Sequence, residues 1–182
     1  MREICLQIGD GLHGTPLYSD NGQYPFINGN NLSEGKIIIT ASTKFVDITE
    51  FQRLFVNLSS NSILLSINGT LGKLAFYQGE KVVLGKSACY CDFVPEMNKT
   101  FMFCLMNTAA FQHFLEDSST KSTIKNVGLK AIRDFKVIIP PLDLQNEFAA
   151  FIEQLDKSKV TIRKSIEKLE TTYRALLQEY FG

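Results

Sequence analysis

Two glycine-rich turns carry the residues with the clearest potential for chemistry. The segment Gly9–Gly14 has the glycine spacing of a dinucleotide-binding loop and follows the strand-like run Ile4–Ile8. Such a site needs a helix to begin at the glycines, so that its N-terminus faces the pyrophosphate. Thr15-Pro16 and Asp20–Gly22 follow instead, and they are typical of a loop. We therefore expect no dinucleotide site here.

The second turn, Gly69–Lys73, resembles a phosphate-binding loop but is too short. That loop has four residues between its glycines and a Ser or Thr after the lysine. Here Thr70-Leu71 separates the glycines and Leu74 follows the lysine. We predict a tight turn between two strands, which leaves Lys73 able to meet a phosphate from outside.

Catalytic, metal and cofactor chemistry lacks the residues that it needs. The histidines are His13 and His113, and neither lies near a Gly-x-Ser-x-Gly elbow. No nuclease-type carboxylate cluster and no methyltransferase motif is present. The cysteines form no Cys-x-x-Cys pair, and we expect them to be reduced and packed (Cys5, Cys89, Cys91 and Cys104). The sequence predicts no catalytic residue, no metal and no cofactor; an independent enzyme is the weakest alternative.

The composition allows a globular domain without pointing to a ligand. Of the 182 residues, 45% are hydrophobic, and 19 basic residues balance 19 acidic ones. Nucleic-acid-binding domains are usually basic, so the zero net charge argues mildly against DNA unless the charges are segregated onto one face. No basic-apolar leader or membrane-length apolar run occurs, which favours a cytoplasmic protein with no membrane segment.

The elements that position these residues change in type at Pro140-Pro141. Residues 1–141 contain short runs rich in Ile, Val, Phe and Tyr, bounded by turn residues, and this is typical of strands. They predict a mixed, β-rich α+β domain, with residues 142–182 as one long helix. The predicted strands are Ile4–Ile8, Pro25–Ile27, Lys36–Ala41, Ser62–Ile67, Leu74–Tyr77, Val82–Leu84, Ala88–Val94 and Phe135–Ile139, and the predicted short helices are Lys99–Asp117 and Lys130–Asp134.

The long helix has the pattern of a coiled coil. We expect Asp143 to cap it, and no Gly or Pro follows before Tyr180. Lys159 interrupts the apolar seam and suggests a device that selects one register. We favour a partner helix over packing of the seam on the chain's own core, which is the alternative. The seam residues alternate in steps of four and three: Phe148, Ile152, Leu155, Lys159, Ile162, Ile166, Leu169, Tyr173, Leu176 and Tyr180.

The junction between the two regions resembles a known family. The stretch Ile132–Gln145, running on to Phe148, Ile152 and Leu155-Asp156, is similar to the end of a target-recognition domain in specificity subunits of type I restriction–modification systems. There a last strand ends in a Pro-x-Pro-Pro-Leu-x-x-Gln motif and enters a spacer helix. This chain departs in having Ile139 directly before the prolines and Leu144 where an acidic residue is commoner. Three upstream segments also match in order and spacing: Gly9–Pro16, Pro25–Leu32 and Ser62–Lys73.

The resemblance implies a non-catalytic subunit that reads double-stranded DNA while methyltransferase and restriction subunits act on it. A complete specificity subunit has two recognition domains and two spacer helices, which pack antiparallel and set the distance between two half-sites. This chain has one of each. It is then either part of a longer polypeptide or a half-subunit that forms a homodimer through antiparallel C-terminal helices, and a two-fold dimer predicts a split, palindromic site.

Polar loops supply the candidate DNA contacts. Cations and amides position DNA at its phosphates, and paired donors and acceptors read base edges. We predict phosphate contacts from Lys73, Lys121 and Lys125, and base contacts from Ser119, Thr120 and Asn126. The other candidates from the loops are His13, Thr15, Tyr18 and Lys86.

Two alternatives stay open at this point. A globular head with a dimerising helix also describes a coiled-coil adaptor with no DNA role, and the neutral charge fits it. The specificity domain of a fused restriction–methylation enzyme shares the expected fold, and methyltransferase motifs upstream in the same reading frame would favour it.

Overall fold

The computed structural model describes all residues from Met1 to Gly182 and contains two compact units, Met1–Leu142 and Asp143–Gly182. The first unit, called the head domain below, is a mixed α+β domain, as predicted from the alternating apolar runs. The second unit is nearly all of one helix. No helix of the chain is both long enough and apolar enough to cross a membrane.

A four-stranded antiparallel sheet forms the centre of the head domain. Its strands are β1 (Cys5–Asp10), β9 (Ala88–Phe93), β6 (Ser62–Ser66) and β7 (Leu74–Phe76), in the order β1-β9-β6-β7. Every residue of β6 is buried, because alternate side chains of the strand enter two different cores. Ile63 and Leu65 pack with helices on one face, while Leu64 joins Ala75 and Ala88 on the other.

A second, smaller sheet has the order β5-β2-β8. It consists of β5 (Phe45–Val46), β2 (Tyr24–Ile27) and β8 (Val83–Leu84), and β2 pairs antiparallel with β5 and parallel with β8. A two-stranded hairpin, β3 (Leu32–Ser33) with β4 (Lys36–Ile37), lies against β7. The two remaining short elements of the region are the 3-10 turns η1 (Arg2–Ile4) and η2 (Gly29–Asn31).

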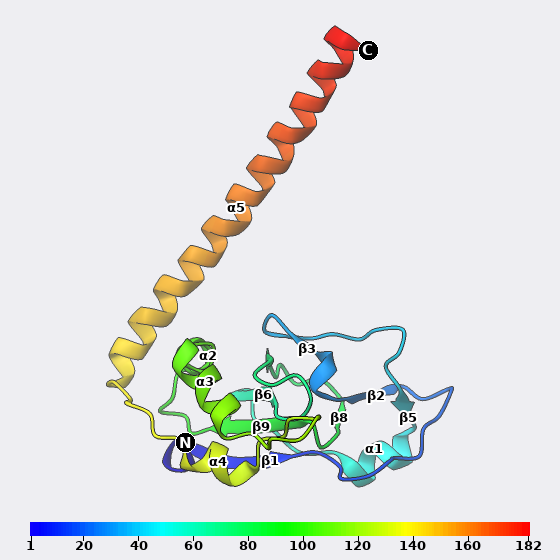
Figure 1. Ribbon diagram of the computed structural model, residues 1–182, viewed down its shortest axis with the longest axis vertical. Coiled ribbons are helices and arrows are strands. Elements are labelled where there is room, and N and C mark those ends of the chain that lie inside the picture. The colour runs from blue at the N-terminus through cyan, green and yellow to red at the C-terminus, as the bar shows by residue number, and fades with distance from the viewer. The chain divides into compact units, whose positions relative to one another are not determined.

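The helices of the head domain gather at its two ends (Figure 1). At one end lie α2 (Lys99–Met106), α3 (Ala109–Asp117) and α4 (Leu129–Asp134), and at the other α1 (Ile48–Leu54) lies beside β2 and β5. The prediction of one helix over Lys99–Asp117 was wrong. The Thr108 side chain accepts a hydrogen bond from the amide of Phe111 at 3.3 Å and so caps a new helix after Asn107.

Several short elements escaped prediction, among them α1 and β5, and two predicted strands changed. The helix α1 begins where the Asp47 carboxylate accepts from the Glu50 amide at 2.8 Å. The strand β5 pairs with β2 through only two residues. The strand predicted over Lys36–Ala41 is limited to Lys36–Ile37, and the strand predicted over Phe135–Ile139 does not form.

The segment 135–139 keeps the side-chain alternation of a strand but has no strand beside it. The carbonyl of Phe135 accepts from the amino group of Met1 at 2.6 Å. Its ring lies 5.0 Å from the ring of Phe111 and 4.6 Å from that of Phe114, and Val137 and Ile139 pack on the same core. Ile138 points outward with 92% of its surface exposed. The side chains of the segment therefore alternate as predicted, but no neighbouring strand pairs with it to form a sheet.

The second unit is the helix α5, which spans Leu142–Phe181 without a break. A helix of 40 residues is about 60 Å long at ~1.5 Å per residue. It begins at Leu142, so Asp143 lies in its first turn, where a carboxylate suits the positive end of the helix, and is not its cap. Every residue from Glu153 to Gly182 is exposed, and these include all seam residues after Ile152.

We predict that Phe111 is a major source of head-domain stability. Phe111 is fully buried in an aromatic cluster, so Phe111→Ala leaves a cavity and should lower the free energy of unfolding by about 3–5 kcal/mol. The matched control Ile138→Ala removes an exposed side chain and should change it by less than about 0.5 kcal/mol. Urea unfolding followed by near-ultraviolet circular dichroism measures both, and equal effects of the two changes would contradict the packing.

Candidate nucleic-acid interface

The polar loop after α3, residues 118–127, is held against the turn between β6 and β7. The amide of Gly69 donates to the carbonyl of Lys125 at 2.9 Å, and the amide of Val127 donates to the carbonyl of Ile67 at 2.9 Å. Between them the Asn68 amide group donates to the Asn126 side-chain oxygen at 3.1 Å. The loop therefore presents a fixed set of side chains, although it belongs to no regular element.

The Gly69–Lys73 segment forms the tight turn that its sequence predicts. Gly69 and Gly72 have positive φ angles of 76° and 79°, which glycine adopts at little cost. The Ser66 hydroxyl donates to the carbonyl of Thr70 at 2.7 Å and accepts from the amide of Lys73 at 2.8 Å. The turn is closed by its own hydrogen bonds, and no helix follows to bind a phosphate.

The loop after β1, residues 11–23, is fixed at several points along its length. Leu12 donates to the carbonyl of Leu84 at 2.7 Å and accepts from the amide of Lys86 at 3.1 Å. A side chain at Gly11 would collide with the Leu84 carbonyl, so this glycine permits the close backbone approach. No helix begins within Gly9–Gly14.

A buried carboxylate fixes the middle of the same loop. The amide of Leu17 donates to Glu50 Oε1 at 3.0 Å, and Arg53 donates to both oxygens of Glu50 at 2.6 and 2.9 Å. The Arg53 hydrogen bonds, followed by that of Leu17, hold the pKa of Glu50 below its usual value. The loop that carries Thr15 and Tyr18 is thus attached to α1 by a hydrogen bond to Glu50, whose carboxylate is itself paired with Arg53 of the same helix.

These loops enclose a hollow of about 540 Å³ that brings four predicted residues together. His13, Lys86, Thr120 and Asn126 line it, although they come from three separate segments of the chain. Its lining also contains residues that sequence reasoning missed as candidates, among them Asn68 and Ser122. Asn68 directly precedes the predicted turn Gly69–Lys73, and no local signal in the sequence marked it for this role.

The charges and polar groups of this hollow suit neutral or anionic ligands with hydrogen-bonding edges. Lys86 is exposed, while Asp10 is bound by His13 at a distance of 2.7 Å. Asparagine amides and the hydroxyls of Thr120 and Ser122 both donate and accept hydrogen bonds. In the chain, no group of three or more His, Cys, Asp or Glu side chains is placed to hold a metal ion.

The other predicted contact residues lie outside this hollow. Tyr18 is 47% exposed, with its ring edge-on to Phe26 at 5.8 Å, and Thr15 is exposed on the same loop. Lys73 is half-buried on its turn. The structure thus spreads these side chains along the surface beside the hollow.

Two of the predicted contact residues in the 118–127 loop, Ser119 and Lys125, are bound to Glu116. The Ser119 hydroxyl donates to the carbonyl of Glu116 at 2.7 Å, which closes the end of α3. Lys125 forms an ion pair with the Glu116 carboxylate, whereas Lys121 is exposed. Ser119 therefore has a structural role, and Lys125 has to leave Glu116 before it can meet a phosphate.

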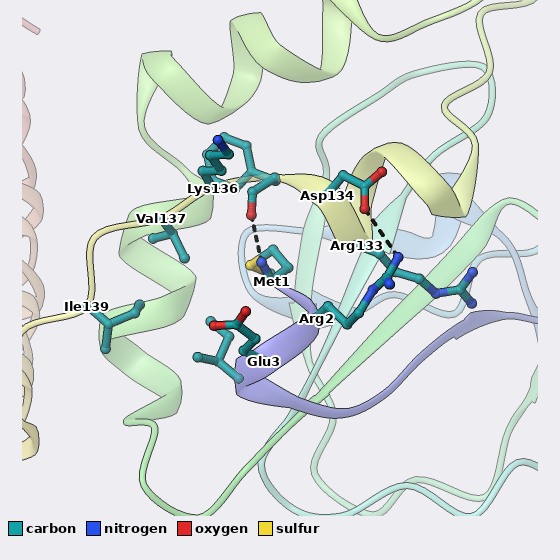
Figure 2. Close-up of a pocket in the computed structure, with 10 residues that line it drawn as sticks. Met1, Arg2, Glu3, Arg133, Asp134, Lys136, Val137 and Ile139 are labelled. Carbon is teal, nitrogen blue, oxygen red and sulfur yellow. Dashed lines mark hydrogen bonds and ion pairs between the residues drawn. The ribbon is translucent and has the colours of Figure 1, made fainter.

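A larger hollow of about 700 Å³ lies elsewhere on the head domain and contains none of the predicted residues. Figure 2 shows Met1, Arg2 and Glu3 facing the segment that carries Asp134 and Lys136. Arg2 lies 3.2 Å from Asp134, whose pKa is lowered chiefly by a hydrogen bond from Lys130. Its lining carries three basic side chains and the amino terminus beside two acidic side chains, and the amino terminus donates to the carbonyl of Phe135.

Comparison with known proteins identifies relatives along almost the entire chain. The model of the type I restriction modification DNA specificity domain matches residues 12–171. The chain is 26% identical over 162 residues to the type I restriction enzyme MjaVIII specificity subunit of Methanocaldococcus jannaschii, covering 88% of this chain and 35% of the relative. The putative type I restriction enzyme MjaX specificity subunit of the same organism is 26% identical, covering 100% of this chain and 44% of the relative.

Solved structures share the fold at low sequence identity. The HsdS subunit of Thermoanaerobacter tengcongensis superposes with a TM-score of 0.68 at 14% identity, covering 98% of this chain and 47% of that one. The S subunit of a type I restriction-modification system from M. genitalium superposes with a TM-score of 0.60 at 17% identity, covering 98% and 42%. The chain therefore spans less than half the length of these relatives.

We predict that Glu50 makes the loop 11–23 sensitive to acid. Its pKa is depressed in the folded state, so its contribution to stability is present at neutral pH and is lost as the pH falls below about 4.3 and on through the lowered value. Glu50→Gln should be less stable than the wild type at pH 7 and should lose less stability between pH 7 and the acid range. Thermal unfolding across this pH series measures it.

Arg53→Met is the matched change on the other side of the ion pair. It removes the donor that lowers the pKa of Glu50, so its stability should also vary less with pH than that of the wild type. A wild-type pH profile in both variants would show that the Glu50 carboxylate and its pair with Arg53 do not contribute to stability.

Proposed function

Because the chain belongs to the type I restriction modification DNA specificity domain family, we propose that it recognises one half of a split DNA site and carries no catalytic step. The observation that carries this proposal is the hollow in which His13, Lys86, Thr120 and Asn126 meet. Amides and hydroxyls there can read base edges, and lysines around it can position the phosphates.

The head domain supplies recognition in this proposal, and α5 supplies attachment to other chains. The methyltransferase and restriction subunits of a type I system then act on the DNA that the head domain holds. The named relatives are specificity subunits of such enzymes, which supports this division of roles. The adaptor alternative leaves the polar hollow without a purpose, and the fused-enzyme alternative needs a methyltransferase region that lies outside these 182 residues.

The exposed seam of α5 supports pairing with a second helix. Ile162, Ile166 and Leu169 are between 50% and 69% exposed, and apolar side chains continue along this stripe as far as Tyr180. Removing such a stripe from water is favourable at about 25 cal/mol per Å², so a partner helix is the expected cover. We propose a homodimer of antiparallel helices, which carries two identical head domains and reads a palindromic site.

Lys159 is the polar residue of the seam and serves in this proposal to select the register. It is exposed and lies 3.2 Å from Asp156, one turn earlier. A polar residue at a core position lowers the stability of a helix pair but disfavours alignments that bury it without a partner.

Sequence-specific binding is tested by selection from a random duplex library with the purified chain. We expect the recovered duplexes to share a motif of two inverted copies separated by a constant spacing. Recovery of duplexes without a common motif, at the same yield as an unselected pool, would contradict a role in DNA recognition.

Two lysines should contribute phosphate contacts that salt can weaken. Lys121→Ala should lower affinity for the selected duplex and reduce the slope of log affinity against log salt by about one. Lys125→Ala should do so by less, because Lys125 is paired with Glu116 in the free protein. Lys81→Ala changes an exposed lysine that lines neither the hollow nor its loops and serves as the control. An unchanged slope for Lys121→Ala would remove it from the interface.

If two copies of the chain pair through the seam, the mass of the protein in solution should depend on seam residues. Changing Ile162, Ile166 and Leu169 to Asn should convert a dimer to a monomer at micromolar concentration, measured by light scattering. The control changes Lys157, Lys164 and Thr171 to Asn, on the opposite face of α5. A monomeric wild-type chain would contradict the homodimer and would leave the seam for a helix of another polypeptide.

A further inference from the structure

The hollow described above continues into two others, because neighbouring hollows share lining residues. His13 and Lys86 line both the 540 Å³ hollow and a second one of about 460 Å³. Phe26 and Asn28 line both that second hollow and a third of about 160 Å³. The three together form one furrow, which runs from the 118–127 loop to the loop of residues 38–44.

The loop 38–44 contains no predicted contact residue, and its first four residues fall within the predicted strand Lys36–Ala41. The Asn31 amide group, which is buried, donates to the carbonyl of Ile38 at 2.9 Å and to the hydroxyl of Thr43 at 3.0 Å. The carbonyl of Lys44 accepts from the amide of Phe26 at 2.8 Å. These contacts fix the loop, so that the exposed side chains of Thr40, Ser42 and Lys44 line the end of the furrow.

Asn28 is the polar side chain common to two of the three hollows. It is half-buried at the C-terminal end of β2. Its side-chain oxygen accepts from the Ser87 hydroxyl at 2.8 Å, and Ser87 in turn accepts from the amide of Gly29 at 2.9 Å. The oxygen is therefore engaged and oriented, and the amide nitrogen is the group that Asn28 offers to a ligand.

The furrow has a chemical character that differs from the composition of the chain as a whole. Of 19 acidic residues in the sequence, Asp10 alone lines it, and Asp10 is bound to His13. Lys86 lies at its middle and Lys44 at one end. The remaining polar lining is made of Asn, Ser, Thr and Tyr side chains. These side chains are uncharged and can form hydrogen bonds with the edges of bases. This local surplus of positive charge reconciles a neutral chain with a polyanionic ligand.

We propose that the whole furrow is the DNA-binding surface, that Asn28 is a specificity-determining residue, and that Lys44 contacts a phosphate at the far end. The proposal rests on DNA recognition by the head domain and adds where the duplex lies and which group reads it. An amide donor with its oxygen engaged needs an acceptor in the major groove. Guanine, thymine and adenine each present one and cytosine presents only a donor, so Asn28 should exclude cytosine at the contacted position.

Selection from a random duplex library, repeated with Asn28→Asp, tests the assignment. The change keeps the size of the side chain and replaces the donor by an acceptor. We expect the preferred base to change at one position of each half-site toward cytosine, whose amino group donates and whose major-groove edge presents no acceptor. The other positions of the motif should stay the same, and affinity for the wild-type site should fall about tenfold.

Lys44→Ala should behave differently, because a phosphate contact carries no sequence information. It should leave the selected motif unchanged and reduce the salt slope by about one. It does not touch the Asn28–Ser87 contact, so it tests the furrow even where Asn28→Asp fails to fold. Near-ultraviolet circular dichroism identifies that failure. Lys36→Ala, in the hairpin beside the loop and outside the furrow lining, is the matched control.

The outcomes separate this inference from the proposed function. A wild-type chain that selects no motif overturns DNA recognition and the furrow with it. A wild-type chain that selects a motif, with a folded Asn28→Asp variant that selects the same one, overturns the role of Asn28 alone. A salt slope that Lys44→Ala leaves unchanged removes the far end of the furrow from the interface.

Discussion

The surface that we assign to DNA depends on backbone hydrogen bonds that attach irregular loops to the edges of a buried sheet. The 118–127 loop is held at the β6–β7 turn through Gly69 and Val127, and the loop after β1 is held at β8 through Leu12. A free loop would lose conformational entropy each time it met a ligand, about 1–2 kcal/mol per residue ordered. Here that entropy is lost during folding, so side chains from distant segments face one furrow before any DNA arrives.

The proposal gives the head domain and α5 different roles, and these roles rest on different kinds of residue. In the proposal, recognition would use neutral amides and hydroxyls, supported by Lys44 and Lys86, and would need no strongly basic chain. The proposed attachment would use the apolar stripe of a helix about 60 Å long, on which every residue from Glu153 onward is exposed. In the proposed dimer, rigid helices between the two head domains would hold these domains at a fixed distance along the DNA. Recognition of a split site requires such a fixed distance.

Much of the fold could be predicted from local patterns, and what failed depended on distant partners. Alternation located β1, β2, β6 to β9, and the Pro140-Pro141 junction located the long helix to within a residue. The 135–139 segment alternates correctly but pairs with the amino group of Met1 instead of a strand. The helix α1 has only seven residues, too few for a periodic signal. The polar character of His13, Lys86, Thr120 and Asn126 was visible in the sequence, whereas their proximity, and the role of Asn28 beside Ser87, arise only from tertiary contacts.

Hydrogen–deuterium exchange of the full chain, with and without a selected duplex, tests most directly whether DNA lies in the furrow. We predict that the duplex slows exchange at backbone amides of three segments: 40–44, 85–88 and 119–126. The segment 1–4 and the segment 133–139 around the larger hollow should exchange at unchanged rates. Slowed exchange confined to those two segments or to α5, with the furrow loops unaffected, would contradict the placement of DNA on this face of the head domain.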